Sequence, residues 1–231
     1  MREKIIGILG GMGPEATIDL LNKIIKLTPA KKDQDHLRII IDNNPKIPDR
    51  TAAILGGGED PLPALQKTAQ NLEKAGVDFI LIPCNTAHYF LPLIQKSIKV
   101  PILNMIEETA KESKKKNPQI KKVGLLASLG TYKTKIYPQH FEKFNIEIIS
   151  PEKKEKDEIM RIIYAVKGGD LSKKIKENIL SIVENLIERG AEAIIAGCTE
   201  IPLILKKEDI LVPLIDPAQI LARVAIEKAR R

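Results

Sequence analysis

The sequence predicts an α/β protein of two similar pseudosymmetric domains, each a parallel sheet flanked by helices in a flavodoxin-like arrangement. Short apolar runs alternate with amphipathic stretches, the apolar runs are nearly continuous, and the two halves of the chain carry matching landmarks. Alternation of strands and helices is typical of parallel sheets with crossover helices. Continuous apolar strands are typical of sheets that are covered on both faces.

Each element is expected from its own pattern of apolar residues. Strands are predicted at residues 4–9, 37–42, 78–83, 100–103, 121–126, 146–149, 192–196 and 211–215. Helices are predicted at residues 14–27, 62–75, 88–98, 105–116, 131–144, 155–167, 171–189 and 217–230. This order places a crossover helix between successive strands.

The two halves match most clearly around two cysteines. Cys84 follows Gly76 at the same spacing as Cys198 follows Gly190, and a Val-Pro pair comes after each cysteine, at 100–101 and 212–213. Matching landmarks in matching order indicate a tandem duplication of one α/β unit. We therefore expect a first domain of residues 1–103 with 212–231, and a second domain of residues 104–211.

Each cysteine is predicted to lie just past the C-terminal end of a strand, at the sheet edge where ligands bind in open α/β sheets. If the two halves face each other, the thiols of Cys84 and Cys198 approach one cleft from opposite sides. Two opposed bases can invert an α-carbon, because one removes a proton and the other returns one to the opposite face. Thiols suit this task, since nearby cations or helix N-termini can lower their pKa towards neutrality. The simpler interpretation is that each cysteine is a small packing residue.

Composition excludes several classes of function. The net charge is +7, but most basic residues lie beside acidic ones, so nucleic-acid binding is not expected. No apolar stretch reaches the 18 residues of a membrane span, and no secretory signal is visible, so a cytoplasmic location is expected. No His/Cys cluster has metal-ligand spacing. The segment 11–16 fits a dinucleotide fingerprint only loosely, and no acidic residue ends a predicted strand at the usual distance of about 20 residues.

Four motifs carry a resemblance to a known family. They are Gly7–Pro14, Asn43-Asn44 with Pro48-Asp49-Arg50, Pro83–His88, and Gly197–Glu200. Together they resemble the aspartate/glutamate racemase superfamily over essentially the whole chain. Gly10-Gly11-Met12 and Glu200 stand where glutamate racemases typically carry an Asp-Ser pair and a histidine, which favours the aspartate branch.

The resemblance implies interconversion of L- and D-aspartate, with Cys84 and Cys198 as the two bases and the active site between the domains. It implies a small acidic amino acid as substrate, no pyridoxal phosphate or other cofactor, no metal, and commonly a homodimer. It also implies that Arg50 binds the side-chain carboxylate, with Lys167 near the same group. The other site residues that it implies are Met12, Asn85, Thr86 and Thr199, with Asn43, Ser128, Thr131 and Glu200 as further candidates.

Some roles stay open at this point. His88 is either a support for the site or a structural residue, and Glu200 either tunes Cys198 or favours a helix N-terminus. Arg50 could also be an ordinary solvated arginine. The alternatives for function are a glutamate or hydantoin racemase, a maleate isomerase, or a non-catalytic protein that binds acidic amino acids.

Overall fold

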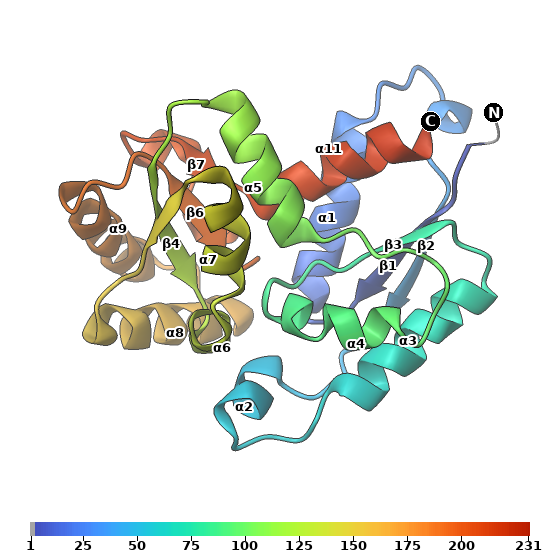
Figure 1. Cartoon of the computed structure of the whole chain (residues 1–231), viewed down its shortest axis with the longest axis horizontal. Coiled ribbons are helices and arrows are strands. Elements are labelled where there is room, and N and C mark those ends of the chain that lie inside the picture. The colour runs from blue at the N-terminus through green and yellow to red at the C-terminus, as the bar shows by residue number, and fades with distance from the viewer. Residues whose placement is uncertain (1–2) are drawn as a thin grey trace. The chain divides into compact units, whose positions relative to one another are not determined.

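The structure is a computed structural model that describes residues 3–231, and it divides into two compact α/β units. The first unit comprises the described residues up to Glu108 together with Ala218–Arg231, and the second comprises Thr109–Pro217. The chain passes from one unit to the other within helix α5 (Met105–Lys116) and again at Pro217. Figure 1 shows the elements of each unit.

The first unit contains a parallel sheet of order β2-β1-β3, formed by β1 (Ile6–Gly10), β2 (Ile39–Asn43) and β3 (Phe79–Leu81). Helices α1 (Pro14–Leu27) and α11 (Pro217–Ala229) cover one face, where they share an apolar cluster with Ile6, Ile8 and Phe79. Helices α3 (Leu62–Lys74) and α4 (Leu91–Gln95) cover the other face (Figure 1).

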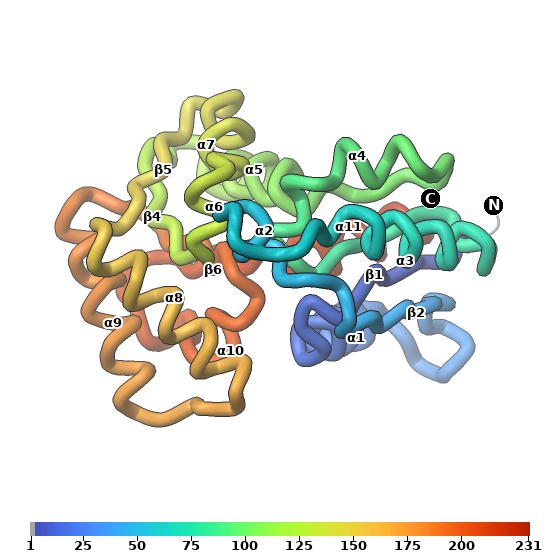
Figure 2. Tube along the Cα trace, turned by 90° about the horizontal axis from the view of Figure 1, so that it is seen from below, coloured from blue at the N-terminus to red at the C-terminus, as the bar shows by residue number. Residues whose placement is uncertain are grey.

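The second unit contains a parallel sheet of order β5-β4-β6-β7. Its strands are β4 (Lys122–Ala127), β5 (Glu147–Ile149), β6 (Ile194–Gly197) and β7 (Leu214–Ile215). Helices α8 (Lys153–Lys167), α9 (Lys173–Glu188) and α10 (Ile201–Ile204) pack against one face. Figure 2 shows α7 (Ile136–Phe141) on the opposite side of β4, and α6 (Leu129–Thr134) contacts α8.

The predicted duplication is visible in the backbone of the two units. In the first, Ile80 N–H donates to Pro101 O at 2.9 Å, and in the second, Ile194 N–H donates to Pro213 O at 2.9 Å. In each unit the strand that precedes a cysteine therefore binds the Val-Pro segment in the same way. The α/β fold class with two parallel sheets flanked by helices is confirmed.

The domain boundaries lie a few residues later than predicted. Residues 212–217 belong to the second unit because β7 pairs with β6, with Ile194 opposite Leu214. Residues 104–108 belong to the first unit because the fully buried Met105 lies in the apolar cluster beneath α1 and α11. The predicted strand at 100–103 is reduced to an isolated parallel bridge between Ile80 and Ile102.

Two predicted helices are interrupted. The helix expected at 88–98 is a 3₁₀ turn at Thr86–Tyr89 followed by α4, because Pro92 lacks the N–H that would continue the turn into the helix. The helix expected at 131–144 is divided into α6, α7 and a 3₁₀ turn at Glu142–Phe144, and Lys135 has a φ of 54° at the first break. The short helices α2 (Arg50–Leu55) and α10 were not predicted, because each is too short for a periodic pattern.

No helix within residues 3–231 has both the length and the apolar character needed to span a membrane.

The close approach of two loops at Gly11 gives a test of the fold. Gly11 has a φ of 94°, and a Cβ added there would lie 2.3 Å from the carbonyl carbon of Asn44. We expect Gly11→Ala to lower the free energy of unfolding by about 2–4 kcal/mol, from the left-handed backbone and the steric overlap together. Urea-induced unfolding followed by circular dichroism measures the change.

Gly56→Ala is the matched control, because Gly56 has a φ of 88° but no atom within 4 Å of an added Cβ. This variant should lose only about 1–2 kcal/mol, which is the cost of the backbone conformation alone. Equal losses in the two variants would show that the approach of Gly11 to Asn44 contributes nothing.

Candidate functional site

Cys84 lies at the carboxyl edge of the first sheet, shortly after β3 ends at Leu81, as the sequence predicted. Its side chain is 6% exposed and belongs to the apolar cluster between the sheet and α3. The Cys84 N–H donates to Ile82 O at 2.8 Å, so the chain turns sharply as it leaves the strand. Because β1 and β2 run parallel to β3, their carboxyl ends reach the same edge.

His88 holds the Cys84 loop through two backbone contacts. Its Nε2 accepts the N–H of Met105 at 3.1 Å, and its Nδ1 lies 2.8 Å from Cys84 O. Since a backbone N–H can only donate, Nε2 must be unprotonated, and the ring proton sits on Nδ1 and is donated to Cys84 O. The buried His88 is thus a structural link between the cysteine loop and the start of α5, with both ring nitrogens occupied.

Met12 follows the glycine loop at the end of β1 and packs in the same apolar cluster as Cys84. Gly11 N–H donates to Thr17 Oγ1 at 2.9 Å, and Asn44 N–H donates to Gly10 O at 3.3 Å. These bonds tie the loop to α1 on one side and to the end of β2 on the other. The buried Met12 is therefore held in place at the edge that carries the cysteine.

Three more predicted residues belong to this edge of the first unit. Asn85 and Thr86 are buried immediately after Cys84, and Thr86 begins a 3₁₀ turn that α2 contacts. Asn43 is the last residue of β2 and is exposed.

Arg50 is the first residue of α2. Asp49 caps this helix by accepting the N–H of Ala52 at 2.8 Å. The cap fixes the first turn of α2 and with it the start of the arginine side chain. The Arg50 side chain is 8% exposed, so the alternative of an ordinary solvated arginine is wrong.

The guanidinium of Arg50 binds only carbonyl oxygens. One terminal nitrogen donates to Ile47 O at 3.2 Å and Pro48 O at 2.9 Å, and the other lies 3.5 Å from Met12 O. Its Nε is buried without a hydrogen-bond partner. No carboxylate pairs with Arg50 among the residues that the structure describes. Arg50 is therefore a buried cation whose hydrogen-bond donors are only partly satisfied.

Cys198 lies at the carboxyl edge of the second sheet, directly after β6. It is partly buried, and its thiol donates to Glu200 Oε2 at 2.9 Å. The Thr199 hydroxyl donates to the same carboxylate oxygen at 3.3 Å. Glu200 is 5% exposed, so its charge is held beside the thiol and away from bulk water.

The electrostatic surroundings of Cys198 differ from our expectation. Burial raises the pKa of the Cys198 thiol well above its usual value, and the Glu200 carboxylate raises it further. The positive charge of Lys167 lowers this pKa, but by less than these two effects raise it. The expectation that neighbouring groups lower the thiol pKa is therefore wrong for Cys198, because the adjacent acid stabilises the protonated thiol.

Three other predicted residues lie in the second unit. Lys167 is exposed at the end of α8, with its amine 5.8 Å from the centre of the Tyr164 ring. Ser128 caps α6 at the end of β4, where its Oγ accepts the N–H of Thr131 at 3.3 Å and lies 3.2 Å from Thr131 Oγ1. Both hydroxyl residues are buried at the edge that carries Cys198.

Two tyrosines near Cys198 were not predicted. The Tyr132 hydroxyl donates to Leu125 O at 2.8 Å and accepts the N–H of Ala127 at 2.9 Å, which braces the last residues of β4. Tyr137 is fully buried, and burial, with a smaller effect from the negative charge of Asp216, raises its pKa well above the usual value. The scarcity of aromatic residues is the only sequence signal that could have singled them out.

Among the described residues, no group of three or more His, Cys, Asp or Glu side chains could hold a metal ion.

Comparisons with known proteins agree with these features. The family model Asp/Glu/Hydantoin racemase matches residues 9–225. The broad specificity amino-acid racemase RacX of Bacillus subtilis (strain 168) is 32% identical over 228 residues, which cover 96% of this chain and 96% of that protein.

Two solved structures are similar over nearly their whole length. The aspartate racemase of Picrophilus torridus is 35% identical with a TM-score of 0.87, covering 98% of this chain and 94% of that one. An aspartate racemase homologue from Pyrococcus horikoshii OT3 is 31% identical with a TM-score of 0.80, and the match covers 99% of this chain and 100% of that one.

The contact between Cys198 and Glu200 can be tested by alkylation. In a Cys84→Ser background only Cys198 reacts with iodoacetamide, and its raised pKa predicts slow reaction at pH 8. Adding Glu200→Gln removes the negative charge, so the pKa falls and the thiolate fraction rises by about tenfold for each pKa unit. We expect the alkylation rate, measured by mass spectrometry, to rise by about tenfold for each unit by which the pKa falls.

Glu184→Gln is the control, because Glu184 is an exposed acid on α9 in the same unit. It should leave the alkylation rate unchanged. If Glu200→Gln also leaves it unchanged, the carboxylate does not control the thiol.

Proposed function

Because the chain belongs to the Asp/Glu/hydantoin racemase family, we propose that it interconverts L- and D-aspartate by transferring the α-proton between two cysteines. The observation that carries this proposal is the placement of Cys84 and Cys198 at corresponding carboxyl edges of two duplicated sheets. Family membership makes the chain an isomerase acting on a small amino acid. The identity of the substrate and of the two bases is our inference.

The proposed reaction exchanges the roles of the two thiols. The thiolate of one cysteine takes the α-proton and becomes a thiol, which leaves a carbanion stabilised by the adjacent carboxylate group. The thiol of the other cysteine then gives its proton to the opposite face of the carbon and becomes a thiolate. No bond to a cofactor is needed, because the two cysteines supply both the acid and the base.

The surroundings of Cys198 suggest which thiol starts protonated. Burial and Glu200 both favour the neutral thiol, so Cys198 enters the first half of the cycle as the acid, with Cys84 as the base. The forward reaction leaves Cys198 as the thiolate and Cys84 as the thiol. The reverse direction starts from that state, with Cys198 as the base and Cys84 as the acid.

Arg50 supports aspartate as the substrate. A planar guanidinium matches a carboxylate with two parallel hydrogen bonds, and the spare donors of the buried Arg50 suit the second carboxylate of an acidic amino acid. Met12 and Thr86 belong to the same unit and edge, and we assign them with Asn85 and Thr199 to the walls of the pocket. Two of the structural relatives are an aspartate racemase and a homologue of one.

The alternative to an enzyme specific for aspartate is a racemase that accepts several amino acids. The Bacillus subtilis relative is a broad specificity amino-acid racemase, so turnover of glutamate and neutral amino acids is the competing expectation. Comparing kcat/KM for aspartate, glutamate and alanine decides between them, since only the first two carry a second carboxylate. Binding of aspartate with no racemisation of any amino acid would favour the non-catalytic alternative.

The two cysteines can be tested directly with L-aspartate. The protein, dialysed against a chelator and treated with hydroxylamine, should still convert L-aspartate to the racemate, as followed by circular dichroism. Cys84→Ser and Cys198→Ser should each lower the rate by at least about 100-fold, because a hydroxyl is too weak an acid to provide the anion. Unchanged thermal unfolding shows that each variant is folded.

Solvent isotope exchange gives a second measurement. In D₂O, deuterium should enter the product enantiomer first, because the delivering thiol has already exchanged with solvent. Each serine variant should still exchange the α-proton of one enantiomer, a different one for each variant. Near-native racemisation by either variant would show that its cysteine is only a packing residue.

Arg50 can be tested by comparing substrates. Arg50→Ala should lower kcat/KM for aspartate by about 30- to 1,000-fold, which corresponds to roughly 2–4 kcal/mol of lost transition-state binding. Any turnover of alanine should change much less, because alanine has no side-chain carboxylate. Arg38→Ala is the control, since Arg38 is exposed just before β2, at the other edge of the sheet. Equal losses for aspartate and alanine would remove Arg50 from substrate recognition.

A further inference from the structure

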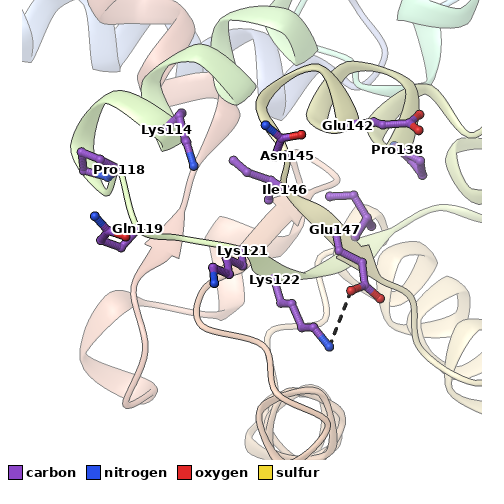
Figure 3. A pocket seen from close by; sticks show the side chains of 11 residues that line it. Lys114, Pro118, Gln119, Lys121, Lys122, Pro138, Glu142, Asn145, Ile146 and Glu147 are labelled. Carbon is purple, nitrogen blue, oxygen red and sulfur yellow. Dashed lines mark ion pairs between the residues drawn. The ribbon is translucent and has the colours of Figure 1, made fainter.

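The second unit has a cavity that the proposed reaction does not use. Its volume is about 730 Å³, which is within the usual range for small-molecule sites. Figure 3 shows the side chains that line it. They are Lys114, Pro118, Gln119, Lys121, Lys122, Pro138, Glu142, Asn145, Ile146, Glu147 and Ile148.

This cavity lies at the amino edge of the second sheet. Lys122 is the first residue of β4, and Glu147 is the first residue of β5. Cys198 follows the last residue of β6, and β4, β5 and β6 are parallel. The cavity and Cys198 are therefore at opposite ends of the same strands.

Three lysines line the cavity, and two of them, Lys114 and Lys121, have no acidic partner among the described residues. The third, Lys122, forms an ion pair with Glu147 at 3.6 Å, and Figure 3 shows its side chain directed towards that carboxylate. Lys114, from the last turn of α5, and Lys121 form no ion pair with any residue that the structure describes. In Figure 3 the Lys114 side chain points down, towards the side of the cavity where Lys121 lies.

The backbone beside these lysines is fixed. Glu192 accepts the N–H of Lys121 at 3.2 Å and the N–H of Lys122 at 3.2 Å. The Glu192 carboxylate is thus engaged with the backbone at the start of β4.

The remaining walls are largely apolar. Two prolines and two isoleucines line the cavity, and the side chain of Ile146 is held in place because it is only 3% exposed. The acidic Glu142 lies beside Pro138, well apart from Lys114 and Lys121 (Figure 3). A ligand would therefore meet the positive charge of Lys114 and Lys121 and the aliphatic surface of the prolines and isoleucines. The side chains of Gln119, Asn145, Glu142 and Glu147 form the rest of the wall.

We propose that this cavity is a binding site for a small organic anion, a carboxylate or phosphate ester that carries an apolar part. The ammonium groups of Lys114 and Lys121 bind the anionic group, and the prolines and isoleucines contact the apolar part. The site is separate from the one that we assign to aspartate, because it involves neither cysteine loop.

The fluorescent anion 1-anilinonaphthalene-8-sulfonate is a suitable probe, because it joins a sulfonate to aromatic rings. We expect saturable binding at one site per chain, weakening as salt is added. The double variant Lys114→Glu/Lys121→Glu should bind at least about tenfold more weakly, since attraction becomes repulsion. Lys174→Glu is the control, because Lys174 is an exposed lysine on α9 of the same unit.

Competition separates the two parts of the proposal. Hexanoate should displace the probe, whereas hexanol, inorganic phosphate and aspartate should displace it poorly. Unchanged binding by the double variant, with thermal unfolding like that of the native protein, would overturn the proposal. Equal displacement by hexanol and hexanoate would also overturn it, by showing that the lysines play no part. Both results are independent of racemase activity.

Discussion

The parallel pairing of strands is the constraint on which the candidate site depends. In a parallel sheet every strand ends at the same edge, so residues far apart in sequence meet there. In the first unit this edge collects the glycine loop after β1, Asn43 at the end of β2, and Cys84 after β3. In the second it collects Ser128 after β4 and Cys198 after β6.

The two units share a scaffold but differ in what surrounds each cysteine. Asp78 accepts the N–H of Ile5 at the start of β1, and Glu192 accepts the N–H of Lys121 before β4, so an acid ties two neighbouring strands in each unit. Next to the cysteines this similarity ends. The Cys84 loop is held by the neutral ring of His88, whereas Cys198 faces the charge of Glu200. In the reaction that we propose, one thiol is protonated while the other is not, and this difference favours the proton on Cys198.

Much of this architecture could be predicted from sequence, for a physical reason. Long periodic segments such as α1 and α9 bury a continuous apolar stripe, and that stripe is visible in the order of residues. Short elements carry no period, which is why α2 and α10 were missed. Pro92 and Lys135 interrupt helices through local backbone geometry that apolar periodicity does not record.

The candidate site was predicted unevenly for a similar reason. The positions of Cys84 and Cys198 follow from strand ends and a repeat, both of which are properties of the chain. The burial of Arg50 and its lack of an acidic partner depend on how the loop with Met12 packs against the segment with Ile47 and Pro48. The raised pKa of Cys198 depends on the burial of the thiol and on the rotamer that brings Glu200 to 2.9 Å from it. Spacing in the sequence cannot supply either of these facts.

The division of the chain into units has a consequence for its synthesis. The second unit is one continuous segment, whereas the first needs α11, which ends two residues before the C-terminus of the sequence. On the ribosome, the second unit therefore has all of its residues before the first can complete its core. Until Leu221 and Ala225 emerge, the face of the first sheet that carries Ile6 and Ile8 is covered by α1 but lacks α11. Part of the apolar face of the first sheet thus stays exposed on the nascent chain until α11 has left the ribosome.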